Sequence, residues 1–135
     1  MFEKPIRAGL DTVENKWPKN LKGTRAGLLV HPASVDCKFE HAVDLFRKSK
    51  KFQLNALFGP QHGIRGETQD NMIEWEGFVD RKTGLPVYSL YGHARKPGPA
   101  MLKDIDAMVI DMQDIGSRYY TLSGRWTYAW RHVRR

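Results

Sequence analysis

The sequence has only one cysteine, Cys37, and it contains no run of eighteen apolar residues. A single cysteine excludes an internal disulfide framework and a thiolate metal site, so we interpret Cys37 as a thiol in a loop. The missing apolar run argues against a membrane-spanning helix, and we expect no membrane partner. The first seven residues lack the apolar stretch and cleavage site of a signal peptide, so we expect a cytoplasmic protein.

Several catalytic motifs are also absent from the sequence. There is no glycine-rich phosphate-binding motif and no Gly-x-Ser-x-Gly motif, which leaves nucleotide binding and serine hydrolysis without support. The five histidines lack ligand spacings such as His-Glu-x-x-His, and no cysteine pair accompanies them. We therefore expect no metal site.

The positive charge is concentrated near the C-terminus. The chain carries a net charge of +7, and residues 122–135 hold four arginines and no acidic residue, so removing them leaves +3. The same segment holds two of the four tryptophans and shows little helical or strand periodicity. Because the charge is local, we expect no nucleic-acid partner, and a nucleic-acid binder built on this segment is our weakest function hypothesis.

Apolar segments that end at glycine, proline or polar residues predict four strands, and two other segments predict helices. The strands are residues 25–30, 53–58, 86–90 and 107–110, and the helices are residues 40–50 and 99–103. Strands that alternate with helices at this spacing predict an α/β fold with a mostly parallel sheet. The segment 107–110 is apolar on both faces, so we expect it to be a central strand.

The most informative stretch is Gly59-Pro-Gln-His-Gly-Ile-Arg-Gly-Glu67, directly after the second predicted strand. Ligands of open parallel sheets bind at the carboxyl ends of the strands. Three glycines and a proline around Gln61, His62, Arg65 and Glu67 suit a rigid backbone that presents polar side chains to a ligand. Alternatively, the glycines serve turn geometry alone and His62 bonds a neighbouring carbonyl.

A second polar cluster follows the fourth predicted strand. It contains Asp111, Asp114, Arg118 and Tyr119. Neighbouring carboxylates raise each other's pKa, whereas an arginine lowers it, so such a grouping can tune an acid for catalysis. Asp114 is equally well explained as a helix N-cap, and we favour Asp111 as the functional residue.

Further acids and aromatic residues suit a carbohydrate ligand. Glycoside hydrolysis usually requires two carboxyl groups, and Glu67 and Glu74 supply candidates, although solvated surface glutamates are common. Tyr91 and Tyr119 can stack on sugar faces, although aromatic residues beside a sheet often belong to the core.

With these motifs in view, the chain resembles the exo-β-N-acetylmuramidase family. The blocks that carry the resemblance are residues 27–36, 56–66, 83–92, 95–97 and 111–121, which occur in order. The resemblance implies a Rossmann-like catalytic domain followed by a smaller domain, and an enzyme that removes terminal N-acetylmuramic acid from the non-reducing end of peptidoglycan fragments. It also implies that no cofactor is needed. The expected partner is a peptidoglycan-derived sugar or muropeptide.

The resemblance also suggests roles for the polar residues. We expect catalysis from His62, Glu67 and Asp111, and substrate binding from Gln61, Arg65, Glu74, Tyr91, Asp114, Arg118 and Tyr119. Many relatives have glutamate at the position of Gln61, and an amide cannot deliver a catalytic proton. We therefore expect Glu67, Glu74 or Asp111 to take that role.

The resemblance ends near Thr121. We expect residues 1–121 to be the N-terminal part of a truncated Rossmann-like catalytic domain, and residues 122–135 to be an aberrant basic tail from a frameshift or truncation. The chain alone should then be inactive, and it should expose apolar surface and dimerise or dissolve poorly. The alternative from another class is a non-catalytic module that binds sugar or muropeptide, or an α/β fragment without function.

Overall fold

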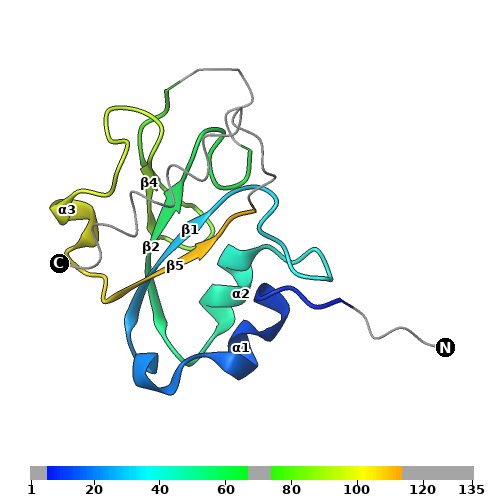
Figure 1. The fold of residues 1–135 in the computed structure, drawn as a ribbon. Coiled ribbons are helices and arrows are strands. Elements are labelled where there is room, and N and C mark those ends of the chain that lie inside the picture. The colour runs from blue at the N-terminus through cyan, green and yellow to red at the C-terminus, as the bar shows by residue number, and fades with distance from the viewer. Residues whose placement is uncertain (1–5, 67–73, 114–135) are drawn as a thin grey trace.

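A computed structural model describes residues 6–66 and 74–113 of the chain. Short helical turns come first, and five strands follow, with one helix after β1 and another before β5 (Figure 1). In chain order the elements are the 3-10 helix η1 (Leu10–Thr12), α1 (Val13–Lys16), the 3-10 helix η2 (Lys19–Leu21), β1 (Arg25–Val30), α2 (Ala42–Lys48), β2 (Gln53–Gly59), β3 (Phe78–Val79), β4 (Pro86–Ser89), α3 (Pro99–Leu102) and β5 (Ala107–Asp111).

The strands form one mixed sheet in the order β3-β4-β2-β1-β5. The pairs β4–β2, β2–β1 and β1–β5 are parallel, whereas the two-residue β3 pairs antiparallel with β4. Because the parallel strands all end at the same edge, the segments that follow Val30, Gly59, Ser89 and Asp111 lie along that edge. This carboxyl edge of the sheet is where a ligand site is expected.

Strand β2 contains one residue more than its neighbour β1 over the paired stretch. Ala26 pairs with Leu54 and Gly27 pairs with Ala56, so the register skips Asn55. A bulge of this kind reverses the alternation of side chains beyond it. As a result, Leu54 and Leu57 both pack into the same hydrophobic cluster, although residues three apart in a regular strand face opposite sides.

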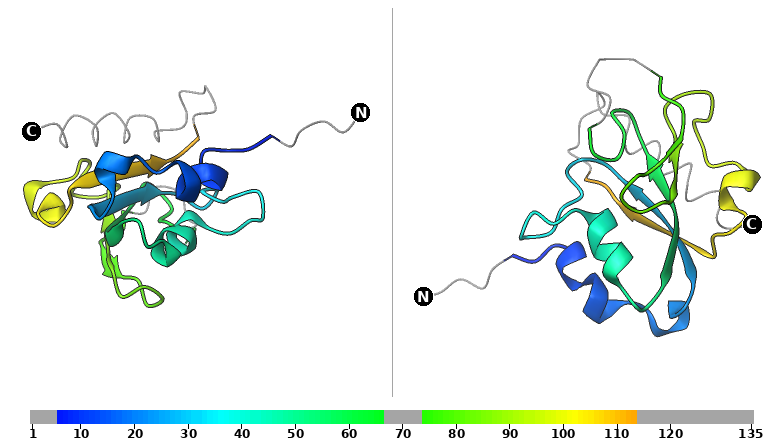
Figure 2. Two further views of the ribbon diagram at one scale, coloured as in Figure 1. Left: turned by 90° about the horizontal axis from the view of Figure 1, so that it is seen from below. Right: turned by 180° about the vertical axis from the view of Figure 1, so that it is seen from behind.

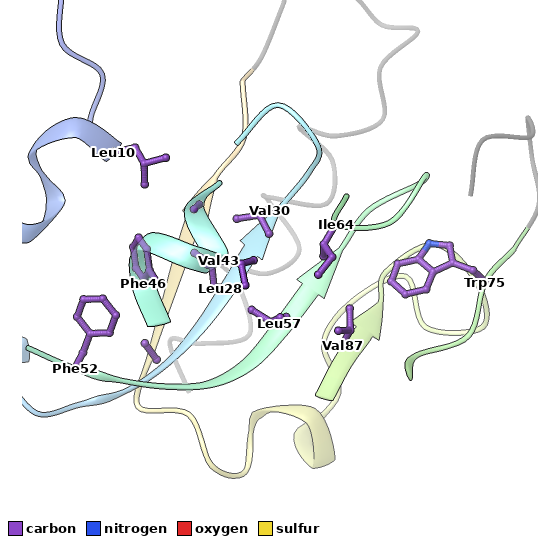
Figure 3. Close-up of a cluster of buried hydrophobic side chains, with 12 residues drawn as sticks. Leu10, Leu28, Val30, Val43, Phe46, Phe52, Leu57, Ile64, Trp75 and Val87 are labelled. Atoms are coloured by element: carbon purple, nitrogen blue, oxygen red, sulfur yellow. The ribbon is translucent and has the colours of Figure 1, made fainter. Parts of the chain in front are cut away.

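The two faces of the sheet carry different hydrophobic clusters, and Figure 2 shows α2 against one of the faces. One face packs against α2 and the N-terminal turns through Leu28, Val30 and Phe46. In this cluster the aromatic end, with Phe46 and Phe52, lies opposite the end formed by Ile64, Val87 and Trp75 (Figure 3). Burying a side chain such as Phe46 contributes about 2 kcal/mol, so this face carries much of the folding energy.

Within residues 6–66 and 74–113, the second face packs against α3 and the residues around it. Its buried members are Leu29, Ala56, Phe58 and Leu90, and Met101, Leu102 and Ile105 pack against them. Gly27 lies beneath this layer, since a β-carbon there would come within 2.8 Å of Ile105. A side chain at position 27 would therefore separate the sheet from the segment after α3.

The predicted α/β fold with a mostly parallel sheet is confirmed, and the four predicted strands and two predicted helices all form. The N-terminal turns and β3 were not predicted. The expectation that residues 107–110 form a central strand is wrong for the described residues, where β5 lies at one end of the sheet and pairs with β1. An apolar pattern indicates that both faces of a strand are packed, but it does not indicate how many strands pair with it.

No helix within residues 6–66 and 74–113 is long and apolar enough to cross a membrane.

Candidate functional site

The loop after β1 and the residues after β5 meet at the carboxyl edge of the sheet. The Ser34 hydroxyl donates to the backbone oxygen of Asp111 at 2.5 Å. The Gln113 side-chain amide donates to the backbone oxygen of Ala33 at 3.3 Å. These bonds fix the end of β5, and with it the Asp111 side chain, against the β1 loop.

Ser34 also fixes the orientation and tautomer of His31. Its hydroxyl oxygen accepts a bond from the His31 backbone amide at 3.1 Å and lies 2.9 Å from His31 Nδ1. The single hydroxyl proton is already committed to Asp111, so Nδ1 must be the donor. In the neutral ring, Nε2 of His31 is then an unprotonated nitrogen that can accept a proton.

His41 connects this group to helix α2 and to the loop after β2. Its Nε2 lies 3.2 Å from the His31 carbonyl oxygen, and its Nδ1 accepts the Val43 amide at 3.3 Å as the N-cap of α2. The Ile64 backbone, in the loop after β2, lies near the His41 ring and acts to raise its pKa. We call His31, Ser34, His41 and Asp111 the edge cluster.

Burial shifts the titration of the edge cluster. It lowers the pKa of His31 and of His41 below their usual values, because the charged ring is poorly solvated. The Asp111 charge opposes this shift at His31, and the His31 carbonyl and the Asp44 charge oppose it at His41. Burial also raises the pKa of the Asp111 carboxyl, and the nearby imidazoles and Ser34 offset only part of this shift. The arrangement favours a neutral imidazole beside a carboxyl group that holds its proton more tightly than usual.

The loop after β2 presents Gln61 and His62 on a tightly held backbone. His62 adopts φ 72° and Gly63 adopts φ 79°, the left-handed region that favours glycine and that histidine occupies uncommonly. The indole of Trp75 donates to the Pro60 carbonyl at 3.1 Å. At Gly59 a β-carbon would meet the Trp75 ring at 2.9 Å, so the ring packs directly on the backbone there. Gln61 and His62 are themselves half-buried.

Arg65 points toward helix α2. Its guanidinium lies 3.5 Å from the Asp44 carboxylate, which also receives the Lys82 ammonium at 2.7 Å. Although burial opposes it, these two cations lower the pKa of Asp44 below its usual value. The structure thus gives Arg65 a carboxylate partner within the protein, and its role in substrate binding stays a prediction.

Glu74 and Tyr91 lie at the β4 side of the edge, away from Asp111. The Glu74 carboxylate pairs with Arg95 at 3.7 Å, and the Arg95 guanidinium lies 6.0 Å from the centre of the Tyr91 ring. Strands β4 and β5 are separated by β2 and β1, a distance of about 14 Å at the usual strand spacing. Glu74 therefore lies on the other side of β2 and β1 from Asp111, and its role in substrate binding stays a prediction.

Four of the predicted site residues, Glu67, Asp114, Arg118 and Tyr119, lie outside the described residues. The sequence reasoning did not single out His31, Ser34 or His41 as site residues, although the segment 31–34 directly follows a predicted strand at this edge. A signal was present, because a histidine directly after a buried strand, with a serine three residues later, allows a turn in which the hydroxyl bonds back to the histidine. In the part of the chain that the structure describes, no group of three or more His, Cys, Asp or Glu side chains is arranged to hold a metal.

Comparison with known proteins gives consistent matches to one family. The family model described as "Exo-beta-N-acetylmuramidase NamZ, N-terminal" matches residues 26–133. This range includes most of the segment 122–135, whose aberrant origin stays a prediction. The chain is 44% identical over 128 residues to the peptidoglycan β-N-acetylmuramidase NamZ of Bacillus subtilis (strain 168), covering 94% of this chain and 31% of that protein.

Two solved structures, both of DUF1343 family proteins from Bacteroides fragilis NCTC 9343, share the fold. The first superposes with a TM-score of 0.78 at 41% identity and covers 91% of this chain and 30% of its own. The second has a TM-score of 0.65 at 30% identity and covers 87% of this chain and 28% of its own. The chain therefore spans about a third of the length of these relatives. The chain belongs to the NamZ exo-β-N-acetylmuramidase family, and it corresponds to the N-terminal part of its members.

Proposed function

We propose that the chain supplies part of the active site of a glycosidase that releases terminal N-acetylmuramic acid from the non-reducing end of peptidoglycan fragments, with Asp111 as the proton donor. The observation that carries this proposal is the half-buried Asp111 carboxyl, whose pKa burial raises at the carboxyl edge of the sheet. A general acid must hold its proton until the leaving oxygen takes it, and a raised pKa serves that purpose.

The edge cluster supports this role through position and charge. Ser34 holds the end of β5 in place through the Asp111 backbone oxygen. The neutral His31 ring, held by Ser34, leaves an unprotonated Nε2 in the same cluster. After Asp111 has given up its proton, a nearby imidazole that gains one would stabilise the carboxylate. His31 therefore acts as a positioning residue in this proposal.

The second carboxyl group and the remaining contacts are part of the same proposal. Glu67 is the candidate for the base or nucleophile, and His62 and Gln61 are candidates for orienting the sugar. Arg65 and Arg118 are candidates for the carboxylate of N-acetylmuramic acid, since a guanidinium fork matches a carboxylate. Tyr119 and Asp114 are further candidates for binding this sugar, and Glu74 and Tyr91, at the β4 side of the edge, are candidates for binding the rest of the glycan.

The residue at position 61 provides a direct test of the donor assignment. Gln61 has an amide at a position where the family resemblance predicts glutamate in many members, and an amide cannot act as an acid. If Asp111 is the donor, Gln61→Glu changes the rate of sugar release by less than about threefold. A gain of about a hundredfold or more would assign the donor role to position 61 instead.

The activity test must allow for the length of the chain relative to its relatives. We would measure sugar release from a chromogenic N-acetylmuramide by the chain alone and by a fusion to the remaining two thirds of the Bacillus subtilis relative. We expect release from the fusion only. Release by neither protein, together with measurable binding of the substrate, would instead favour the non-catalytic binding module.

A further inference from the structure

A cavity beside β4 is separate from the edge cluster. It has a volume of about 420 Å³, within the usual range for small-molecule sites, and lies between the residues before β3, the end of β4 and the loop before α3. Its lining residues include Glu74, Trp75, Glu76, Tyr88, Ser89 and His93. The separation of about 14 Å between β4 and β5 places it well away from Asp111.

The walls of the cavity are rigid and partly aromatic. Trp75 is 8% exposed, and its indole is fixed by the bond to the Pro60 carbonyl. The Tyr88 ring packs against Phe58 at 5.3 Å between ring centres. Rings held in this way offer apolar faces at little entropic cost, which suits the face of a sugar ring.

A buried hydroxyl with donor capacity lines the same cavity. Ser89 is 8% exposed, and its oxygen accepts the Tyr91 backbone amide at 3.1 Å. Within residues 6–66 and 74–113 this hydroxyl has no acceptor, so its proton is available to a bound group. A buried donor without a partner costs free energy, and a ligand oxygen would recover it.

The charge of the cavity selects among ligands. Glu74 and Glu76 contribute two carboxylates, and Arg95 offsets one of them through its ion pair with Glu74. The lining is therefore acidic, in a chain whose net charge is +7. Carboxylates accept hydrogen bonds from hydroxyl and amide groups, but they repel an anionic sugar.

We propose that this cavity is a subsite for an uncharged, hydroxyl-bearing sugar unit, and that it excludes the acidic sugar assigned above to the edge cluster. The inference rests on the proposed function for its connection to a glycan. Its physical basis is independent of that function, because it depends on the shape, the Ser89 donor and the charge of the cavity. A ligand that occupies both places would span the edge from β4 to β5.

The test is a titration of the full chain followed by nuclear magnetic resonance. The probes are chitotriose, an uncharged trimer of N-acetylglucosamine, and N-acetylmuramic acid, which is an anion at neutral pH. We expect chitotriose to shift the Trp75 indole N–H and the Gly92 amide, with the indole assigned through Trp75→Phe. N-acetylmuramic acid at the same concentration should leave both signals in place.

Two variants and a control sharpen the result. Glu76→Gln keeps the shape of an exposed side chain and should weaken chitotriose binding about tenfold, because one charge-assisted hydrogen bond is lost. Ser89→Ala should weaken binding about fivefold. Glu14→Gln changes an exposed glutamate of α1, outside the cavity, and should have no effect.

The inference is overturned if chitotriose fails to move the Trp75 and Gly92 signals, or if N-acetylmuramic acid moves them equally. It is also overturned if cadaverine, a diamine that carries two positive charges and no hydroxyl group, moves them equally, because the cavity would then bind cations and not sugars. This outcome is distinct from failure of the proposed function. If the chain binds chitotriose here and the fusion protein releases no sugar, the subsite is supported and the glycosidase activity is contradicted. If the fusion protein releases sugar and the chain does not bind chitotriose, the glycosidase activity is supported and the subsite is contradicted.

Discussion

The paired strands β1 and β5 carry an aspartate and a basic side chain at each end, and the two ends behave differently. At the amino end, Arg25 binds Asp106 at 2.7 Å and Asp104 at 3.3 Å, with all three side chains well exposed. At the carboxyl end, Asp111 and His31 are half-buried, and burial lowers the pKa of the histidine. Hydrogen bonds from Arg25 lower the pKa of Asp106 to about 2, whereas burial raises the pKa of Asp111.

The difference reflects both the solvent exposure of each carboxyl group and the chemistry of its basic partner. An exposed carboxylate with a permanent cation stays ionised and cannot act as an acid near neutral pH. A half-buried carboxyl beside an imidazole is easier to keep protonated, and its neighbour can change charge in the physiological range. The amino end is suited to holding the strands together, and the carboxyl end is suited to proton transfer.

The largest expected effect comes from exchanging the two aspartates for amides in the fusion protein. Asp111→Asn removes the proposed donor and should lower the rate of sugar release about a thousandfold. Asp106→Asn at the opposite end of the strands should leave the rate within about twofold, since it lies far from the site. Equal losses of sugar-release rate in the two variants would show that the two ends of the strands do not differ in function.

The next effect concerns the stability of the carboxyl end. Ser34 is fully buried, and its hydroxyl bonds to three groups of His31 and Asp111. Ser34→Ala leaves these groups without that partner and should lower the free energy of unfolding by about 2 kcal/mol, measured by urea denaturation. Ser49→Ala, at the C-cap of α2, is the matched control, and its loss should be clearly smaller.

A smaller effect concerns pH. Because the pKa of His31 is lower in the folded chain than in the unfolded chain, its contribution to stability is present above about pH 6.5 and is lost as the pH falls below it. The groups that face it are His41, Asp111 and the Gln113 amide. Asp111 acts in the opposite direction, since its raised pKa favours the folded chain as the pH falls.

We therefore expect His31→Gln to lose less stability than the original chain between pH 7.5 and pH 5.5, as measured by urea denaturation at each pH. Exposed His93→Gln is the control and should follow the original chain. If the free energies of unfolding of His31→Gln and of the original chain changed in parallel with pH, the burial of His31 would make no contribution to the pH dependence of stability.

The smallest effect is expected at the exposed end. Since the pKa of Asp106 is lowered to about 2, its stabilising contribution is complete above about pH 4 and disappears as the pH falls through 2. Asp106→Asn should remove this contribution, so its loss of stability should be present at neutral pH and vanish as the pH falls through about 2; the loss should be small, because the pair is exposed. High salt should reduce the difference further, because exposed pairs are screened.

The sequence predicted those parts of the fold that have a long, regular pattern. The strand at Arg25–Val30 and the helix at Ala42–Lys48 have clear apolar periodicity and terminal signals. Strand β3 has only two residues, both exposed, and it exists because it pairs with β4, so no local pattern indicates it. The position of β5 at one end of the sheet likewise depends on tertiary pairing.

The candidate site was predicted in part, for a similar reason. Asp111 could be identified because it ends a buried strand, which marks the carboxyl edge of the sheet. Ser34 could not be identified in this way, because its importance comes from contacts with Asp111, 77 positions away in the sequence. The distance that separates Glu74 from Asp111 also follows from the order of the strands, which the sequence alone did not reveal.

The extra residue in β2 has a consequence for comparing members of the family by length. Asn55 is skipped in the pairing with β1, and it lets Leu54 and Leu57 share one face. A relative that had lost this single position would have to turn one of the two leucines to the opposite layer. An alignment gap at position 55 would thus signal a rebuilt core, whereas a gap in the exposed turn at residues 81–82 would signal only a shorter connection.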